Sequence, residues 1–354
     1  MAKVIVGMSG GVDSSVTAAL LQQQGHEVIG VMLRLWSEPG KEDANRCCTP
    51  DSMALARRVA ARLKIPFYVV DARQVFHATV VQSFLQGYAA SQTPNPCLVC
   101  NRLIRWGFLL DHASALGGEY LATGHYARRQ VTSQGRVELL RARDLSKDQS
   151  YVLHVLDQAK LSRSLFPLGE YTKKEVRKLA ESFDLPVADR PDSQDLCFLA
   201  GGDYRDFIRR VSPETLIPGP IRTREGRELG QHSGLPNYTI GQRKGLGVPS
   251  AGLLYVLGKD PSTNSLIVGT REELGSQDLM VSAVNWISGE APLHPFQAQV
   301  KTRYTAREVP GRVTPVEGGT TCQVHLDVAV RDVTPGQAAV FYQDDLLLGG
   351  GTIV

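Results

Sequence analysis

The sequence predicts an α/β N-terminal domain with a parallel sheet, followed by a small central domain and a C-terminal β-barrel. Over residues 1–210, short apolar runs typical of buried strands alternate with helical patterns of about 10–15 residues. Over residues 211–272, proline and glycine divide the chain into short segments. Over residues 273–354, β-type runs recur between turn residues at fairly regular spacing, which indicates a small barrel or sandwich. We take the barrel as the expected fold.

In the first domain, strands and helices follow one another in turn. Val16, Leu20 and Gln23 have helical spacing, and Gly25 ends that helix. Asp51 or Ser52 is expected to cap the next helix. This alternation predicts a parallel sheet covered on both faces. The predicted strands are 3–8, 28–33, 66–70 and 120–123, the later helices are 52–63, 76–90 and 103–116, and the β-type runs of the second half are 254–257, 265–269, 297–304, 312–315, 321–326 and 338–342.

The composition is that of an ordinary globular protein. The chain has 354 residues, of which 42% are hydrophobic and 21% charged, enough to build the cores of two or three domains. The net charge of +3 argues against an indiscriminate polyanion binder and leaves room for a local basic groove. No apolar run approaches the ~18 residues of a membrane span. The N-terminus has no signal-peptide core, so we expect a cytoplasmic protein with no membrane partner.

A glycine-rich loop, Ser9-Gly10-Gly11-Val12-Asp13-Ser14, joins the first strand to the first helix. Glycine lets backbone N–H groups approach phosphate oxygens, and the helix N-terminus favours negative charge. The pattern is neither a Walker A loop nor a dinucleotide fingerprint. It resembles the PP-loop of ATP pyrophosphatases, which implies an adenine nucleotide α-hydrolase-like fold with ATP and Mg²⁺ as cofactors. The resemblance gives the contacts with the nucleotide to Gly7, Met8, Ser9, Gly10, Gly11, Val12 and Ser14, and places Asp13 near Mg²⁺. The structural alternative is a glycine turn with Asp13 as a helix cap.

Other strand ends should supply the same site, because open parallel sheets bind ligands at the carboxyl ends of their strands. Leu33 ends the second strand and could line an adenine pocket through its backbone. Gly124 follows a short strand and permits close approach of a ligand. His125 would face the same crevice, or is an ordinary surface histidine.

Three of the six cysteines stand in polar turns. Cys97 and Cys100 follow two prolines just ahead of a predicted helix, where a thiolate is favoured, and Cys197 lies in another polar loop. A Cys-x-x-Cys pair indicates metal or redox chemistry, but without a second pair a zinc knuckle has weak support. Cys47 and Cys48 are expected to be exposed bystanders, and Cys322 a packing residue.

The chain as a whole resembles one family, the tRNA-specific 2-thiouridylases. The matching stretches run nearly from end to end, at 7–14, 93–96, 100–101, 122–126, 147–151, 197–198, 239–246 and 335–337. The resemblance implies that ATP adenylates the C2 oxygen of the wobble uridine and releases pyrophosphate, and that sulfur then displaces AMP. It assigns the nucleophile to Cys100 and the persulfide to Cys197, with a disulfide between them to be reduced. The implied partners are tRNA, at its anticodon loop, and a sulfur donor such as a cysteine desulfurase or sulfur-relay protein.

One position departs from a familiar version of the pattern. Cys97 stands where some members have aspartate, which puts the acid/base role of that aspartate in doubt. Cys97, Cys100 and Cys197 could together hold three irons of a [4Fe–4S] cluster. We slightly favour the persulfide route, because two cysteines suffice for it, and keep the cluster open.

The resemblance also implies where tRNA binds. Asn95, Pro96 and Cys97 would face the target base. An unstacked base in a single-stranded loop suits aromatic and arginine contacts. The residues expected to contact tRNA are His125, Lys147, Asp148, Gln149, Arg303, Tyr304 and Gln343. The alternative to tRNA binding, for each charged residue, is an ordinary surface charge in contact with solvent.

Three other functions compete with this interpretation. A PP-loop ligase that adenylates a small molecule explains the loop but not Cys100 and Cys197. A tRNA 4-thiouridine synthetase also uses a PP-loop, but the β-rich second half fits it less well. A non-enzymatic iron–sulfur or zinc protein that binds nucleic acid explains the cysteines but not residues 9–14.

Overall fold

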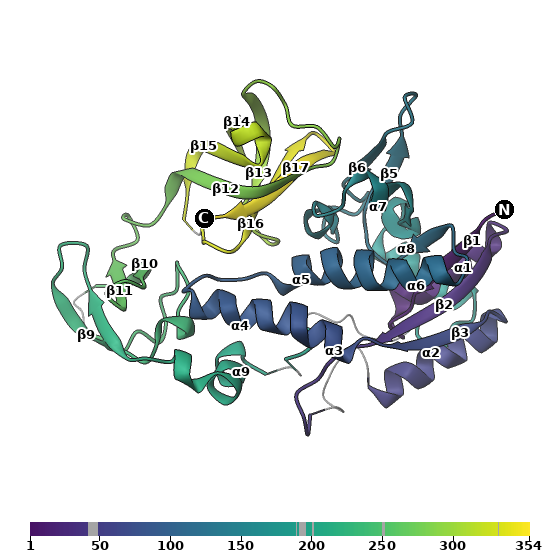
Figure 1. Cartoon of the computed structure of the whole chain (residues 1–354), viewed down its shortest axis with the longest axis horizontal. Coiled ribbons are helices and arrows are strands. Elements are labelled where there is room, and N and C mark those ends of the chain that lie inside the picture. The colour runs from purple at the N-terminus through teal and green to yellow at the C-terminus, as the bar shows by residue number, and fades with distance from the viewer. Residues whose placement is uncertain (42–48, 189, 191–195, 200–201, 250–251, 332) are drawn as a thin grey trace.

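The computed structural model describes residues 1–41, 49–188, 190, 196–199, 202–249, 252–331 and 333–354, so Cys47 and Cys48 lie outside the described residues. Figure 1 shows the C-terminal barrel beside the N-terminal domain, with the central strands β9, β10 and β11 at the end of the molecule far from β1, β2 and β3. The described part of the chain contains no helix both long and apolar enough to cross a membrane.

The parallel sheet predicted for the N-terminal domain is present and has five strands, in the order β3-β2-β1-β4-β7, of which β7 was not predicted. The chain runs outward from β1 to β2 and β3, and then returns to place β4 on the other side of β1. This reversal puts a topological switch point between the carboxyl ends of β1 and β4, where such sheets bind ligands. The strands are β1 (Lys3–Gly7), β2 (Glu27–Arg34), β3 (Phe67–Asp71), β4 (Tyr120–Ala122) and β7 (Ser164–Leu165).

Helices cover both faces of this sheet. On one face, α1 (Val12–Gln23), α2 (Pro50–Leu63) and α8 (Lys173–Ser182) bury Val16, Val59 and Val176 against β1 and β2. On the other face, Trp106 and Ala113 pack against Ile5 and Leu121. The cap of α2 is Thr49, whose hydroxyl accepts the N–H of Ser52 at 3.1 Å, and not Asp51 or Ser52 as predicted.

The helix that carries Cys97 and Cys100 begins earlier than residue 103. It runs through α5 (Pro96–Val99), η3 (Cys100–Leu109) and α6 (Leu110–Ala115), with a kink at Trp106. Pro96 occupies the first turn, where its missing N–H costs nothing, and Asn95 accepts the N–H of Cys97 at 3.1 Å. The preceding helix is likewise continuous from α3 (Arg73–Phe76) through η2 (His77–Val81) to α4 (Gln82–Ala89).

The C-terminal strands close into the predicted barrel, in the order β12-β15-β14-β13-β16-β17 and back to β12. Val300, Val324 and Phe341 fill its interior. The sequence pattern missed its first and last strands. The barrel strands are β12 (Ser276–Trp286), β13 (Phe296–Lys301), β14 (Val309–Val316), β15 (Thr321–Val330), β16 (Ala338–Gln343) and β17 (Leu346–Ile353), with η8 (Glu317–Gly319) between β14 and β15.

A hairpin from the N-terminal half joins the barrel sheet, which the sequence did not predict. β5 (Arg128–Val131) pairs with β6 (Val137–Leu140), and β6 pairs with β17. Leu139, Tyr151, Val340 and Tyr342 form one core cluster with residues of the parallel sheet. The N-terminal domain and the barrel therefore share a continuous core. Between β6 and α8 lie η4 (Ser150–Leu153), α7 (Gln158–Ser162) and η5 (Pro167–Glu170).

The central segment carries its own four-stranded sheet, in the order β10-β11-β8-β9. Ile221, Val256 and Leu266 form its small core. Its elements are α9 (Tyr204–Val211), η6 (Pro213–Thr215), β8 (Gly219–Arg222), β9 (Glu228–His232), η7 (Leu235–Asn237), β10 (Tyr255–Asp260) and β11 (Ser265–Gly269).

Candidate active site

The glycine-rich loop lies at the switch point, between β1 and the start of α1. Gly10 has a φ of +73°, and a Cβ there would come within 2.3 Å of the Ser52 backbone oxygen, so only glycine fits. The hydroxyl of Ser14 accepts the N–H of Ser9 at 3.1 Å and donates to the Gly11 oxygen at 3.2 Å. These contacts fold the loop around the N-terminus of α1, a geometry that suits an anion.

Residues in and beside the loop pack into the N-terminal domain. Met8 and Val12 are buried in the core beneath α1, and the Met8 N–H donates to the Val31 oxygen at 2.8 Å. Gly7 ends β1, and Leu33 lies near the end of β2, opposite Val70 of β3. Gly7 has no side chain and those of Met8 and Val12 are buried, so any contribution of these three residues to a ligand would come from their backbones, whereas the Leu33 side chain is partly exposed.

Asp13 does not cap α1, because its carboxylate is engaged elsewhere. Lys173 contacts both carboxylate oxygens at 2.8 Å, and the Tyr126 hydroxyl donates to one of them at 2.8 Å. Lys173 opens α8, which begins with a capping box between Thr172 and Glu175. The sequence reasoning missed Lys173, because 160 residues separate it from Asp13.

A second cation that the sequence reasoning missed lies against the loop. The Arg190 guanidinium donates to the Gly10 oxygen and to the Ser52 hydroxyl, both at 2.7 Å, and so ties the loop to α2. Lys173 and Arg190 thus bring two positive charges to a loop whose own residues carry only Asp13. Arg190 also borders a cavity of about 510 Å³, lined by Asp51, Leu55, Leu185, Pro186, Ala188 and Arg190.

The turn after β4 packs directly against the loop. A Cβ on Gly124 would lie 2.9 Å from the backbone of Asp13 and Ser14. Gly124 therefore allows the backbone of α1, rather than a ligand, to pack closely against it. His125 is only 5% exposed, unlike a surface histidine. Its ring contacts the Thr123 hydroxyl at 2.7 Å through Nδ1 and the Arg105 guanidinium at 2.7 Å through Nε2. Burial, and then the charge of Arg105, hold the pKa of His125 well below its ordinary value, so the ring is neutral.

The helix that begins at Pro96 presents the first two thiols. Cys97 is exposed in its first turn, and Cys100 is half-buried one turn later. The neighbouring Asn101 is 2% exposed and donates from Nδ2 to the Val152 oxygen at 2.8 Å. This bond fixes the Cys100 segment against residues 150–153, next to the predicted tRNA-binding stretch.

Cys197 lies at the edge of the same cluster of side chains as Cys100. Phe198 is buried against Phe84, with ring centroids 5.2 Å apart, and both thiols pack at the margin of the core that these rings form. Both thiols therefore border one core cluster, although the two cysteines lie far apart in the sequence. Cys322 is fully buried in β15, as expected of a packing residue.

None of the cysteines in the described ranges takes part in a disulfide. Within the same ranges, no three His, Cys, Asp or Glu side chains are grouped closely enough to hold a metal ion. The predicted ligands of an iron–sulfur cluster, Cys97, Cys100 and Cys197, are therefore not assembled as ligands in this structure.

The barrel holds the loop that precedes the cysteine helix. The Thr93 N–H donates to the Pro335 oxygen, and Gln337 donates from Nε2 to the Thr93 oxygen, both at 2.8 Å. Gly336, with a φ of +90°, has no room for a Cβ, which would lie 3.0 Å from Thr93 and Gln92. Residues 335–337 thus set the position of Asn95 and Cys97.

The stretch 147–149 is held by hydrogen bonds within the N-terminal domain. Asp148 is 5% exposed and accepts hydrogen bonds from the Ala142 N–H at 2.8 Å and the Ser150 hydroxyl at 2.7 Å. The Gln149 side chain accepts the Tyr126 N–H at 3.0 Å. Because the side chains of Asp148 and His125 are buried, neither fits a direct contact with tRNA. Both residues can instead position their neighbours.

One residue predicted to contact tRNA, Tyr304, is partly exposed and packs beside η4. Burial raises the pKa of the Tyr304 hydroxyl, the charge of Asp148 raises it further, and that of Lys147 lowers it. The Tyr304 ring, 40% exposed, lies 6.2 Å from that of Tyr151. Two further predicted residues, Arg303 and Gln343, are exposed, the second at the end of β16.

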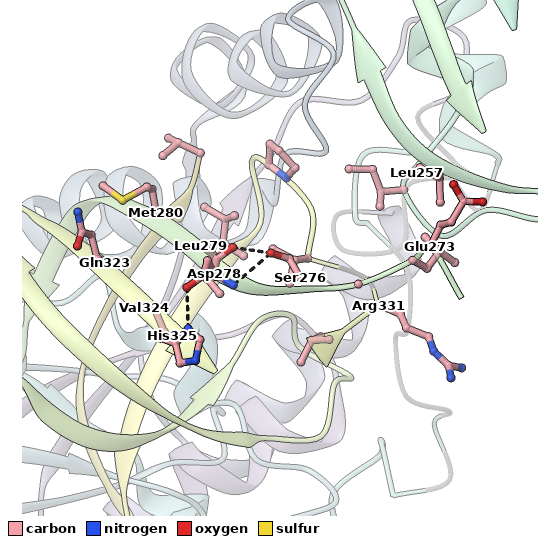
Figure 2. Close-up of a pocket in the computed structure, with 18 of the residues that line it drawn as sticks. Leu257, Glu273, Ser276, Asp278, Leu279, Met280, Gln323, Val324, His325 and Arg331 are labelled. Carbon is pink, nitrogen blue, oxygen red and sulfur yellow. Dashed lines mark hydrogen bonds and ion pairs between the residues drawn. The ribbon is translucent and has the colours of Figure 1, made fainter. Parts of the chain in front are cut away.

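A separate cavity of about 720 Å³ lies between the central domain and the barrel, as Figure 2 shows. His325 contacts Asp278 at 2.7 Å within it, and Glu273 and Arg331 lie on its other side. Acidic and basic groups thus stand together in its lining, which includes no cysteine among the described residues. The candidate chemistry lies elsewhere, at the loop and the thiols.

Family models match all three parts of the chain. A model described as tRNA methyl transferase HUP domain matches residues 2–201, one described as tRNA methyl transferase PRC-barrel domain matches 205–270, and one described as aminomethyltransferase beta-barrel domain matches 276–353. A relative from Chloroflexus aggregans, named tRNA-specific 2-thiouridylase MnmA, is 49% identical over 100% of this chain and 98% of its own length. A relative of the same name from Moorella thermoacetica is 48% identical over 99% of this chain and 98% of its own.

Solved structures resemble the chain more distantly. NMN synthetase from Francisella tularensis is 18% identical, with a TM-score of 0.36 over 60% of this chain and 77% of its own. A 4-thiouridine synthetase in complex with RNA and ATP is 13% identical, with a TM-score of 0.37 over 60% of this chain and 51% of its own. Such low scores support no conclusion about function.

Proposed function

Since the chain belongs to the tRNA-specific 2-thiouridylase family and is a sulfurtransferase, we propose that it replaces the C2 oxygen of the wobble uridine of tRNA with sulfur, in two ATP-dependent stages. The single observation that carries this proposal is that Cys100 and Cys197, far apart in the sequence, pack at the margin of one core cluster. The expected setting is the cytoplasm.

In the first stage the loop at residues 9–14 holds ATP. The uridine O2 attacks the α-phosphorus as N3 gives its proton to solvent, the bond to the β-phosphate oxygen breaks, and pyrophosphate leaves with the electron pair; N3 takes a proton back when 2-thiouridine forms. The N-terminus of α1 together with Lys173 and Arg190 supplies positive charge for this leaving group.

Mg²⁺ fits this loop, because one carboxylate together with substrate phosphates is a common set of ligands for that ion. Asp13 is the residue that would hold the ion, and in this structure its carboxylate forms an ion pair with Lys173. When bound, the ion shields the charge of the phosphates. Among this chain's own residues, Tyr126 keeps Asp13 oriented through its 2.8 Å hydrogen bond.

In the second stage the terminal sulfur of a persulfide on Cys197 attacks C2, and AMP leaves with the electrons of the C2–O bond. The Cys100 thiolate then attacks the Cys197 sulfur, and the electron pair of the broken S–S bond goes to the sulfur on the uridine. The product is a Cys100–Cys197 disulfide, which an external thiol reductant returns to two thiols. A sulfur-donor protein reloads Cys197.

We propose the persulfide route over the [4Fe–4S] cluster. The persulfide route needs only two thiols, and Cys100 and Cys197 both pack at the edge of one hydrophobic core. The cluster needs at least three ligands brought together, and the described residues include no such group. Cys97 then serves as a contact for the target base rather than as a ligand.

The proposed tRNA surface crosses from the cysteine helix to the barrel. Asn95, Pro96 and Cys97 face the flipped uridine, since the barrel fixes their loop. Exposed Tyr304 offers a ring for base stacking. The remaining contacts are Lys147, Gln149, Arg303 and Gln343, while buried Asp148 and His125 hold that surface in place.

The test is product analysis. The protein is incubated with ATP, Mg²⁺, unmodified tRNA and a persulfide donor, and the tRNA is digested to nucleosides. We expect 2-thiouridine, with one pyrophosphate released per uridine modified and none without tRNA. Release of pyrophosphate with a small molecule in place of tRNA would favour a ligase, and 4-thiouridine would identify a different thiolation.

A further inference from the structure

Arg105 lies between the nucleotide loop and the nucleophilic cysteine. Its Nη1 contacts His125 Nε2 at 2.7 Å and the Asn101 side-chain oxygen at 3.4 Å. His125 follows Gly124, which packs against Asp13 and Ser14, and Asn101 follows Cys100. One guanidinium therefore bridges the end of β4 and the helix that carries the thiol.

Both partners of Arg105 are neutral. His125 accepts through Nε2 and donates through Nδ1 to Thr123, because its pKa is held well below the ordinary value by burial and by Arg105 itself. Within the described ranges, no carboxylate forms an ion pair with Arg105. A half-buried charge without an opposite charge is costly, and this cost is recovered when an anion binds.

The donors that remain suit a phosphate. Both contacts to neutral groups use Nη1, and the N–H groups of Nε and Nη2 bond to no acceptor in the described part of the chain. This edge of a guanidinium binds two oxygens of one phosphate side by side. A lysine in the same place would offer charge without the paired geometry.

We propose that Arg105 is a catalytic residue that binds the α-phosphate of the nucleotide, first in ATP and then in the adenylated uridine. The inference rests on the proposed function. As pyrophosphate leaves, the guanidinium neutralises charge on the α-phosphate oxygens. When sulfur attacks C2, the same phosphate departs as AMP, and Arg105 stabilises it as a leaving group. His125 and Asn101 hold the guanidinium in position for both steps.

The test compares AMP, which carries only this phosphate, with adenosine, which carries none. Binding to wild type, Arg105→Gln and Arg105→Lys is measured by calorimetry, with Arg102→Gln as the control because Arg102 is an exposed arginine of the same helix. We expect wild type to bind AMP more tightly than adenosine. Arg105→Gln should weaken AMP binding about tenfold or more and leave adenosine within about twofold, and Arg105→Lys should fall between. The Arg102→Gln variant should match wild type.

Two outcomes overturn the inference, namely an equal loss for AMP and adenosine or no loss for either. A second readout is tRNA-dependent pyrophosphate release, which should fall about 100-fold in Arg105→Gln and recover in part in Arg105→Lys. Failure of the proposed function would give a different result. Wild type would then release no pyrophosphate with tRNA, while its preference for AMP over adenosine would still depend on Arg105.

Discussion

Gln337 of the barrel domain donates from Nε2 to the backbone oxygen of Thr93 at 2.8 Å, across 244 residues of sequence. The Thr93 N–H donates in turn to Pro335, so both backbone groups of Thr93 are held by one loop of the barrel. Asn95, which caps the cysteine helix, follows two residues later. The barrel thus sets where that helix begins, and with it the positions of Cys97 and Cys100.

The first prediction concerns Gly336, at the centre of this contact. Alanine there would have a φ of +90° and a Cβ 3.0 Å from Thr93. We expect Gly336→Ala to lower the free energy of unfolding by about 2 kcal/mol and to slow thiolation about tenfold or more, since a small displacement of reacting groups is costly. Denaturant unfolding and a thiolation assay measure the two effects.

Gly135→Ala is the matched control. Gly135 has a φ of +79°, but it lies in the turn between β5 and β6 with open space around it. It should lose about 1 kcal/mol of stability from backbone strain and keep its thiolation rate. Equal loss of activity in both variants would show that the Thr93 contact does not position the site.

The second prediction concerns the ion pair between Arg141 and Glu308, which joins the N-terminal half to the barrel. Arg141 also stacks on Tyr342 at 3.8 Å, and Tyr342 contacts Ser150 beside Asp148. Glu308→Gln leaves a mostly buried guanidinium uncompensated, so we expect a loss of about 3 kcal/mol in unfolding free energy. Arg136 and Glu290 form an exposed pair, and Glu290→Gln should change stability by less than about 1 kcal/mol. A similar loss in both variants would contradict the role of Arg141 as a buried link.

The third prediction concerns pH. Burial lowers the pKa of His154 from 6.5 to about 4, so the folded protein keeps this ring neutral while the unfolded chain takes up a proton below pH 6.5. Its contribution to stability is complete above pH 6.5 and is lost as the pH falls. Between pH 7 and pH 5 we expect this group to remove about 2 kcal/mol.

Unfolding of wild type and His154→Gln across this range measures that contribution. The variant should show a smaller loss of stability between pH 7 and pH 5, whereas replacement of the exposed His294 by glutamine should leave the wild-type slope unchanged. Parallel slopes in wild type and His154→Gln would contradict the assignment.

Local patterns predicted the architecture, and long-range contacts account for what was missed. Strand 265–269 was predicted to the residue, because its apolar run is bounded by turns. The β5–β6 hairpin was not predicted, since its strands are short and its pairing with β17 depends on residues some 200 positions away. The cysteine helix was expected to begin at residue 103, because Pro94 and Pro96 suggested a turn, although Pro96 favours a helix start.

The candidate site was predictable where its residues form compact motifs. The loop at 9–14 and the cysteines stood out in the sequence. Lys173 and Arg190 carry no local signal, since each is an ordinary cation near a helix until the fold brings it to Asp13 or Gly10. His125 was expected to face tRNA, but burial depends on packing from β4 and η3 that the sequence alone does not specify.

The fourth prediction concerns Cys97. Under the persulfide route it contacts the target base and carries no transferable sulfur, so Cys97→Ser should keep thiolation within about fivefold of wild type, because serine is close to cysteine in size and can also donate a hydrogen bond. Iron and labile sulfide are measured in the same preparations after anaerobic purification. An iron-bearing wild type, with a loss of more than about 100-fold in the variant, would favour the cluster instead.

The most direct test of the account is the amount of 2-thiouridine formed in tRNA by wild type, Cys100→Ser and Cys197→Ser, with ATP and a persulfide donor present. Cys322→Ala is the control, because Cys322 is buried in the barrel away from the proposed chemistry. The account predicts 2-thiouridine from wild type and from Cys322→Ala, and none above background from either serine variant. Continued formation of 2-thiouridine by Cys100→Ser or Cys197→Ser would contradict it.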